Sequence, residues 1–279
     1  MRHITFDAMG TLVEAWVEAD GTGVVEWFEE VEEVCSRFRP TSELSSINAR
    51  APGATSVSPM MAEVLDCASH LRELTSGLVD IGVGGVLTSW GYDRTFPEVI
   101  SLADSPAEGH QVSWTFGDGA VRLGSGTTLD LGGVAKGWAC DQAVARGLAV
   151  VVSAGGDMRS NDTATVASII DPWGDVVAKV HIGRRGLATS SIARRRWEVG
   201  SREVSHIIDP STMEPVETPI LSATAVASSA VEAEAAAKAI LLQGVDGLVW
   251  ADECPWVHGS VVIWNDGSVY GTHDVELVA

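Results

Sequence analysis

A pair of glycines followed by a lysine forms the strongest single motif in this sequence. The stretch Asp130-Leu131-Gly132-Gly133 leads into a helical pattern that carries Lys136 in its first turn. Glycines let a backbone approach a phosphate closely, and a helix N-terminus offers N–H groups and positive potential. Lys136 would add a mobile cation at an end of the helix where the dipole otherwise disfavours one. For a glycine pair taken alone, a plain tight turn is the favoured interpretation, and a phosphate site is the alternative.

A histidine lies at a predicted strand end, in the stretch Ser205-His206-Ile207-Ile208-Asp209-Pro210. Histidine titrates near neutral pH, so His206 could accept a proton from a hydroxyl group. A lone histidine is usually structural, and the neighbouring acid and the rigid Asp-Pro turn make a general base the alternative. A second glycine pair, in Ser153-Ala154-Gly155-Gly156-Asp157, allows the same two interpretations as the first.

Short strands and helices must position these motifs. Apolar spacing predicts helices over residues 24–38, 58–74, 134–146 and 229–243, and a glycine-rich loop over residues 77–91. Alternation and turn residues predict a first strand or hairpin arm within residues 1–19. They also predict strands over residues 111–116, 120–123, 127–131, 150–153, 163–170, 176–182, 187–190, 194–199, 203–208 and 257–264, the last closing in a hairpin. Without strict strand–helix alternation, this mixture favours an α+β fold. We expect one compact, possibly bilobed domain over residues 1–279.

Composition limits the partners of the chain. Its 38 acidic and 18 basic residues give a net charge of -20, which repels nucleic acid and anionic lipid. It lacks both a signal-peptide pattern and a run of about 18 apolar residues, so we expect a cytoplasmic protein without membrane insertion. The four cysteines are far apart and are expected to be reduced.

The order of the motifs resembles one known family. These motifs are AMGT (8–11), SRFRPTSELSSIN (36–48), SGLVDIGVGGVLTSWGYD (76–93), DLGGVAKGWACD (130–141), SAGGD (153–157), ATS (188–190), HIIDP (206–210) and LLQG (241–244). Over residues 4–245 the chain resembles the ApbE family, the FAD:protein FMN transferases. The resemblance implies an α+β, T-fold-like architecture, FAD as the substrate and Mg²⁺ at its pyrophosphate. It also implies that FMN passes through a phosphodiester to a Thr or Ser hydroxyl of an acceptor flavoprotein carrying a flavinylation motif, with release of AMP.

The resemblance also implies roles for particular residues. The positions that match FAD contacts of the family are Met9, Phe38, Val79, Asp80, Ile81, Asp130, Lys136 and Ile208. His206 matches the histidine that activates the acceptor hydroxyl. Gly133, through its backbone carbonyl, and Glu234 match metal-ligand positions. Glu234 and Lys238 are also assigned to the catalytic set.

The late helix departs from the family pattern. The family carries an aspartate and, four residues later, a threonine or serine, both magnesium ligands, where this chain has Glu234 and Lys238. Residues four apart share a helix face, but an ammonium group cannot bind a metal. We hypothesise that the Lys238 ammonium partly replaces the magnesium ion, with Glu234 as its partner. The alternatives are a surface ion pair, and an FAD-binding paralogue that has lost the standard metal site and no longer catalyses transfer.

A remote alternative comes from another class of enzymes. Residues 6–12 resemble the nucleophile motif of haloacid-dehalogenase-like hydrolases, although Met9 stands where their second acid would be. That class needs a doubly wound fold, and the following hundred residues do not show its strand–helix alternation.

Overall fold

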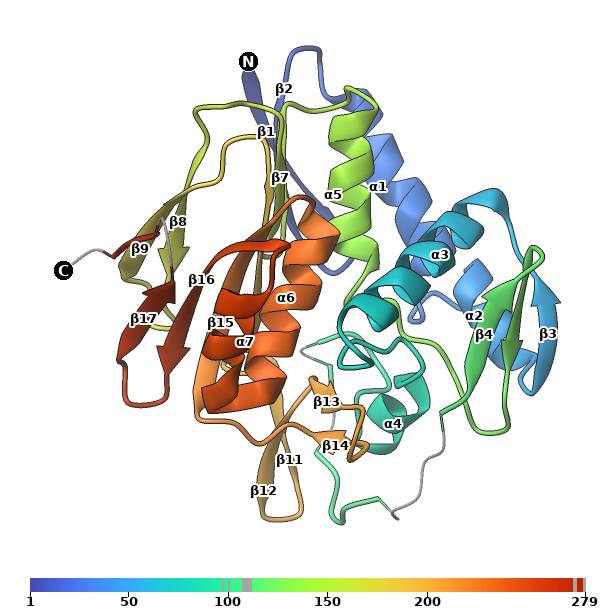
Figure 1. The fold of residues 1–279 in the computed structure, drawn as a ribbon. Coiled ribbons are helices and arrows are strands. Elements are labelled where there is room, and N and C mark those ends of the chain that lie inside the picture. The colour runs from blue at the N-terminus through green and yellow to red at the C-terminus, as the bar shows by residue number, and fades with distance from the viewer. Residues whose placement is uncertain (97, 100, 107–111, 273–274, 278–279) are drawn as a thin grey trace. The chain divides into compact units, whose positions relative to one another are not determined.

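The computed structural model describes residues 1–96, 98–99, 101–106, 112–272 and 275–277. The chain divides into two compact units, and Figure 1 labels most of their elements. Unit 1 comprises residues 1–29, 136–194 and 217–279, and unit 2 comprises residues 30–135 and 195–216. Helix α1 (Thr22–Cys35) contributes residues to both units. Whether residues 1–279 form one domain stays a prediction.

Unit 1 is built on an eight-stranded antiparallel sheet in the order β1-β2-β6-β7-β10-β15-β16-β17. The strands are β1 (Arg2–Ala8), β2 (Thr11–Val17), β6 (Val151–Ala154), β7 (Asp157–Ser160), β10 (Gly186–Ser191), β15 (Ile220–Ala227), β16 (Val257–Trp264) and β17 (Val269–Thr272). The β1–β2 hairpin turns at Met9 and Gly10, whose φ angles of 52° and 69° suit a two-residue hairpin loop. Of the two possibilities for residues 1–19, a first strand or a hairpin arm, the structure has the hairpin.

Opposite faces of this sheet are covered by different elements of unit 1. Leu187 and Ala188 are successive residues of β10, so their side chains point to opposite faces. Ala188 packs with Ala233 of helix α6 (Ala230–Gln243). Leu187 packs with a three-stranded sheet in the order β18-β9-β8, formed by β8 (Val166–Ile170), β9 (Val176–His181) and β18 (Val275–Leu277).

Helix α6 begins and ends where its sequence predicts. Ser229 and Glu232 form a capping box, and Gly244 with φ 60° ends the helix before the 3-10 turn η1 (Gly244–Asp246) and helix α7 (Gly247–Glu253). Gly186 of β10 allows a close approach, because a Cβ atom there would lie 2.1 Å from the backbone of Ser229. The remaining helix of this unit, α5 (Ala135–Ala145), agrees with its predicted bounds to within a residue.

Unit 2 contains short helices and small sheets. Its helices are α2 (Glu43–Ala49), α3 (Pro59–Leu74) and α4 (Gly84–Ser89), together with the end of α1. Its strands are β3 (Gly53–Ser56), β4 (Trp114–Gly117) and β5 (Ala120–Leu123) in the order β3-β5-β4, and the hairpins β11 (Arg196–Val199) with β12 (Arg202–Ser205) and β13 (Ile208–Asp209) with β14 (Glu214–Pro215). Ser58 accepts a hydrogen bond from the Met61 N–H at 3.2 Å and confirms the predicted start of α3.

Three predicted elements of unit 2 were wrong. The expected loop at residues 77–91 contains helix α4, and residues 127–131 form only an isolated bridge at Thr128 instead of a strand. The side chain of Asn48 donates to the Leu129 carbonyl at 2.9 Å and accepts from its N–H at 2.8 Å, so this segment does not need a ladder partner. The Gly84 N–H donates to the Thr128 carbonyl at 3.0 Å.

The third error is the end of helix α1, which stops at Cys35 and not at residue 38. The carbonyl groups of the next turn accept hydrogen bonds from serine side chains, including Ser42 to Ser36 at 2.5 Å and Ser45 to Arg39 at 2.8 Å. Ser42 also caps α2, a helix that apolar spacing does not reveal. Gln111, the first residue of the predicted strand at 111–116, lies outside the described residues.

The architecture as a whole agrees with the predicted α+β class. An antiparallel β1–β2 hairpin replaces the strand–helix unit that a haloacid-dehalogenase-like fold would need around residues 6–12. The four cysteines, all within the described part of the chain, form no disulfide bonds. None of the helices in the described part of the chain is long and apolar enough to span a membrane.

Candidate functional site

Four charged side chains of unit 1, from the first turn of α5, the start of β7 and the middle of α6, form a cluster. The Lys136 ammonium lies 3.0 Å from Asp157 Oδ2, and the Lys238 ammonium lies 3.4 Å from Glu234 Oε1. The second carboxylate oxygen of Glu234 accepts a hydrogen bond from the Ser190 hydroxyl at 3.4 Å. We call Lys136, Asp157, Glu234 and Lys238 the charged cluster.

The local fold explains how these side chains meet. Lys136 lies in the first turn of α5, and Asp157 is the first residue of β7, directly after the Gly155-Gly156 turn. Both glycines have positive φ angles, 61° and 109°, which favour residues without a Cβ atom. Glu234 and Lys238 are one helical turn apart on α6, so they share a face.

Burial governs the electrostatics of the cluster. The side chain of Asp157 is only 2% exposed. Burial raises its pKa to about 7, the Lys136 ammonium opposes this change, and the Glu234 carboxylate adds to it. Asp157 can therefore take up or release a proton near neutral pH. Glu234 is also buried, with 8% of its side chain exposed, so the Glu234–Lys238 contact is not the surface ion pair considered above.

Asp141, whose side chain is largely buried, fixes the start of helix α6 and so the helix that carries Glu234 and Lys238. The Asp141 carboxylate accepts hydrogen bonds from the backbone N–H groups of Ala230 and Val231 at 2.8 and 3.1 Å. Arg159 lies 3.5 Å from the same carboxylate. Burial raises the pKa of Asp141 to about 6, even though the two amides oppose the change.

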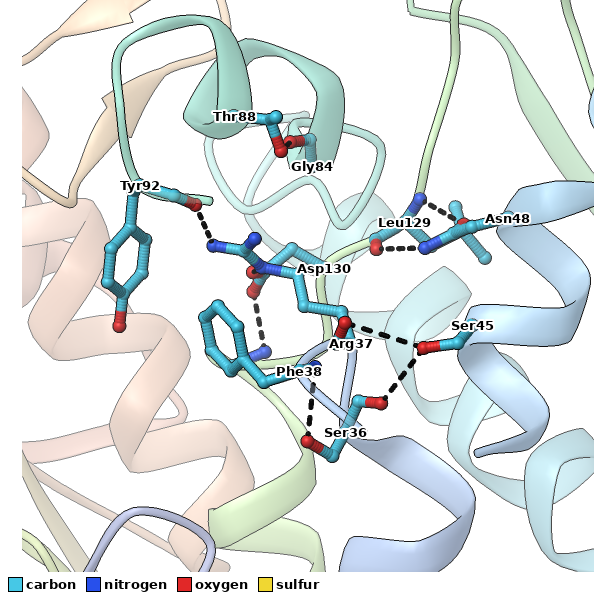
Figure 2. Close-up of polar contacts among 11 residues, drawn as sticks. Ser36, Arg37, Phe38, Ser45, Asn48, Gly84, Thr88, Tyr92, Leu129 and Asp130 are labelled. Atoms are coloured by element: carbon cyan, nitrogen blue, oxygen red, sulfur yellow. Dashed lines mark hydrogen bonds and ion pairs between the residues drawn. The ribbon is translucent and has the colours of Figure 1, made fainter. Parts of the chain in front are cut away.

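In unit 2, one arginine organises several of the predicted site residues (Figure 2). The Arg37 guanidinium contacts the Asp130 carboxylate through Nε and donates to the Tyr92 carbonyl at 2.6 Å. It also lies over the Phe38 ring at 4.2 Å and the Tyr92 ring at 4.8 Å from the centroids. Asp130 in turn accepts a hydrogen bond from the Gly132 N–H at 2.7 Å. The glycine motif, Phe38 and the Tyr92 segment are thereby held together.

The Val79-Asp80-Ile81 segment is fixed to the same motif by its backbone. The Asp130 N–H donates to the Ile81 carbonyl at 2.7 Å. Val79 and Ile81 are buried, so their side chains serve packing. The Asp80 carboxylate accepts from the Trp114 indole at 2.7 Å and pairs with Arg72 at 3.0 Å.

An aromatic group surrounds the predicted general base. His206 meets the Tyr92 ring edge-on at 6.2 Å between centroids, and Tyr92 stacks with Trp197 at 5.7 Å. The Trp197 indole donates to the Trp90 carbonyl at 2.7 Å and so fixes the stack. His206 itself is half-buried, between β12 and β13, and Ile208 packs in the same apolar cluster as Tyr92.

The predicted site residues thus fall into separate groups. Unit 1 brings together Lys136, Glu234 and Lys238, and it places Met9 in the β1–β2 turn. In unit 2, Arg37 contacts Phe38 and Asp130, and Tyr92 packs with Phe38, His206 and Ile208. A backbone hydrogen bond joins Asp130 to Ile81, which directly follows Val79 and Asp80. Gly133 lies in the turn before α5.

Sequence reasoning missed four contributors: Arg37, Tyr92, Asp157 and Ser190. Each lies inside a motif that the sequence singles out, namely SRFRPTSELSSIN, SGLVDIGVGGVLTSWGYD, SAGGD and ATS. The scarcity of basic residues in so acidic a chain could have drawn attention to Arg37. The partners of these residues are distant in sequence and could not be read from it.

The charged cluster does not fit a resident magnesium ion. Magnesium prefers oxygen ligands in octahedral geometry, whereas the two cations of the cluster are ammonium groups that already pair with its carboxylates. Within the described residues, no group of three or more His, Cys, Asp or Glu side chains could hold a metal ion.

Comparison with known proteins gives the family. The profile of the ApbE family matches residues 9–258. The FAD:protein FMN transferase of Rhodobacter capsulatus is 29% identical over 97% of this chain, which spans 57% of the length of that protein. The FAD:protein FMN transferase of Vibrio cholerae is 27% identical, over 87% of this chain and 81% of that protein.

Solved structures share the fold at low sequence identity. The ApbE protein of Thermotoga maritima superimposes with a TM-score of 0.83 and 24% identity, covering 98% of this chain and 97% of that one. The flavin transferase ApbE of Vibrio cholerae gives a TM-score of 0.78 and 23% identity over the same shares. With a profile match over residues 9–258 and this agreement in fold, the chain belongs to the ApbE family.

Proposed function

We propose that this chain is an FAD:protein FMN transferase. The match of the ApbE profile to residues 9–258 carries the proposal, and the relatives that bear this name support it. FAD is the donor, and the acceptor is a flavoprotein that presents a threonine or serine in a flavinylation motif. The cytoplasmic location expected from the sequence is part of the proposal.

The reaction is a phosphoryl-type transfer. The acceptor hydroxyl oxygen attacks the phosphorus of the FMN half of FAD, and a phosphodiester bond forms. The bond between this phosphorus and the bridging oxygen of the pyrophosphate breaks, and AMP leaves with that oxygen. The hydroxyl proton passes to the imidazole of His206, acting as the general base. The packing of His206 against the edge of Tyr92 supports this role, because it orients the ring.

For unit 2 we propose FAD contacts through Phe38, Val79, Asp80, Ile81, Asp130 and Ile208. The burial of Val79 and Ile81 restricts these two residues to backbone contacts. Arg37 positions Asp130 and lies over the Phe38 ring, so it acts through these neighbours. The backbone carbonyl of Gly133, in the turn before α5, would contact a metal ion if one accompanied FAD.

For unit 1 we propose FAD contacts through Met9 and Lys136. Glu234 and Lys238 complete the set, with Lys238 supplying positive charge. The resemblance also assigns Glu234 to a magnesium ion, but the charged cluster does not fit a resident one.

The proposal is tested with purified protein, FAD and an acceptor peptide that contains a candidate threonine. We expect AMP release and a covalently fluorescent peptide. The variant His206→Gln should lower the rate by about 10²- to 10⁴-fold, while its dissociation constant for FAD stays within about threefold of the wild-type value. Bound FAD without AMP release or a labelled acceptor, across several acceptors, would instead identify a non-catalytic FAD-binding paralogue. A protein that does not bind FAD would refute the proposal altogether.

A further inference from the structure

We propose that Lys238 is a resident cation that takes the place of a divalent metal beside Glu234, so that FAD binding by this chain does not require magnesium. The inference deepens the proposed function and rests on it. It concerns the pyrophosphate of FAD, the most strongly charged part of that substrate.

Glu234 already has a partner for each of its carboxylate oxygens. Lys238 contacts Oε1 at 3.4 Å, and the Ser190 hydroxyl donates to Oε2 at 3.4 Å. A magnesium ion bound to Glu234 would need to displace the ammonium group, because the two cations repel each other at short range. The buried position of Glu234 on α6 strengthens this repulsion, since few water molecules can screen it.

The balance of charges in the cluster also indicates that no metal ion is needed there. The chain contains three lysines, Lys136, Lys179 and Lys238, and two of them lie in the charged cluster. Their charges offset those of Asp157 and Glu234 in their ionised forms. Divalent cation sites in proteins are instead rich in carboxylates that lack ammonium partners. The cluster is therefore complete without a metal ion.

The Lys238 ammonium remains accessible to an anion. Its side chain is 19% exposed, compared with 8% for Glu234. An ammonium group has three N–H donors, and the contact with Glu234 uses one of them. The other donors can reach phosphate oxygens, as lysines do in many phosphate sites.

The first test is titration of the full chain with FAD, in buffer with EDTA and in buffer with MgCl₂. We expect the dissociation constant of the wild type to agree within about twofold between the buffers. Lys238→Thr should bind FAD at least about tenfold more weakly in EDTA and regain affinity in MgCl₂, because threonine offers an oxygen ligand and frees Glu234. Lys179→Thr, which changes an exposed lysine of β9, is the matched control and should behave as the wild type.

The second test uses Mn²⁺ alone as the probe and does not depend on FAD. Electron paramagnetic resonance should detect no Mn²⁺ bound at Glu234 in the wild type. It should detect one bound ion in Lys238→Thr, lost when Glu234→Gln is added. Wild-type Mn²⁺ binding that disappears in Glu234→Gln would overturn the inference, even if Lys238→Thr failed to fold. Wild-type FAD affinity that rises tenfold or more with MgCl₂ would also overturn it, while leaving the proposed function intact. Failure of the wild type to bind FAD in either buffer would remove the proposed function and this inference together.

Discussion

Replacing Asp141 with asparagine tests whether burial of a carboxylate at the start of α6 outweighs the hydrogen bonds that it accepts. Asp141 accepts from the N–H groups of Ala230 and Val231, and Arg159 lies 3.5 Å away. These contacts favour the charged form, yet burial raises the pKa of Asp141 from 3.8 to about 6. Desolvation is therefore the larger effect. Asparagine keeps the shape and an acceptor oxygen but removes the charge.

The pKa difference sets the expected magnitude. The folded pKa lies about two units above the unfolded value, and each unit corresponds to about 1.4 kcal/mol. Because the folded pKa is raised, the stabilisation is fully present below the unfolded pKa and is lost as pH rises through the folded pKa. Between pH 4 and pH 7, the wild type should lose about 2.4 kcal/mol of unfolding free energy relative to Asp141→Asn.

Urea denaturation followed by tryptophan fluorescence at pH 4, 5, 6 and 7 measures this difference, provided that the two proteins have equal m-values. Asp266→Asn is a control for which the pH dependence of the stability difference should have the opposite sign. Hydrogen bonds from Ser268 lower the pKa of Asp266, so its stabilising contribution is lost as pH falls. If the difference between wild type and Asp141→Asn did not change with pH, or grew in favour of the wild type as pH rose, desolvation would not dominate at Asp141.

Three further substitutions test other contacts. Arg37→Lys should lower the unfolding free energy by about 1.5–3 kcal/mol in urea denaturation, because an ammonium cannot reproduce the planar contacts of the guanidinium with Asp130 and a backbone carbonyl; an unchanged value would refute this. Gly84→Ala should cost about 1–3 kcal/mol in the same assay, since its Cβ atom would lie 2.8 Å from a backbone oxygen, whereas Gly117→Ala, with open space around it, should not. Relative to Asp157→Asn, the wild type should lose about 1.4 kcal/mol of stability between pH 6 and pH 8, because burial raises the folded pKa of Asp157 to about 7 and the contribution of a group with a raised pKa is lost as pH rises. Thermal denaturation at the two pH values measures this change; a wild type that gained stability relative to the variant between pH 6 and pH 8 would contradict it.

Elements whose signals lie within a few residues were predictable from the sequence. The capping box of α6, the Ser58-Pro59 start of α3 and the turn between β16 and β17 each depend on neighbours along the chain. Their bounds agree with the predictions because the residues that satisfy the end groups are local.

Elements that depend on distant partners were not predictable. Residues 127–131 carry a strand pattern, but the side chain of Asn48, 81 positions away, satisfies the backbone of Leu129. The glycines of α4 allow that helix to approach the same segment, so a glycine-rich stretch is helical here. Propensity would predict a loop, and the close backbone contact overrides it.

The order of motifs identifies the family but leaves the chemistry of single residues open, and Lys238 shows why. Four residues from Glu234 on a helix, it is equally consistent with a solvated surface pair and with a cation beside a substrate. Strand β10 distinguishes the two, because Ser190, 44 positions away, contacts the second oxygen of Glu234 and the alanines of α6 pack close to the sheet. An ion pair on the surface is strongly screened by water and contributes little free energy. The Glu234–Lys238 pair is buried, so its charges interact strongly, and the ammonium group can exclude a metal ion. The meaning of a charged residue in this family thus depends on what the sheet places opposite it.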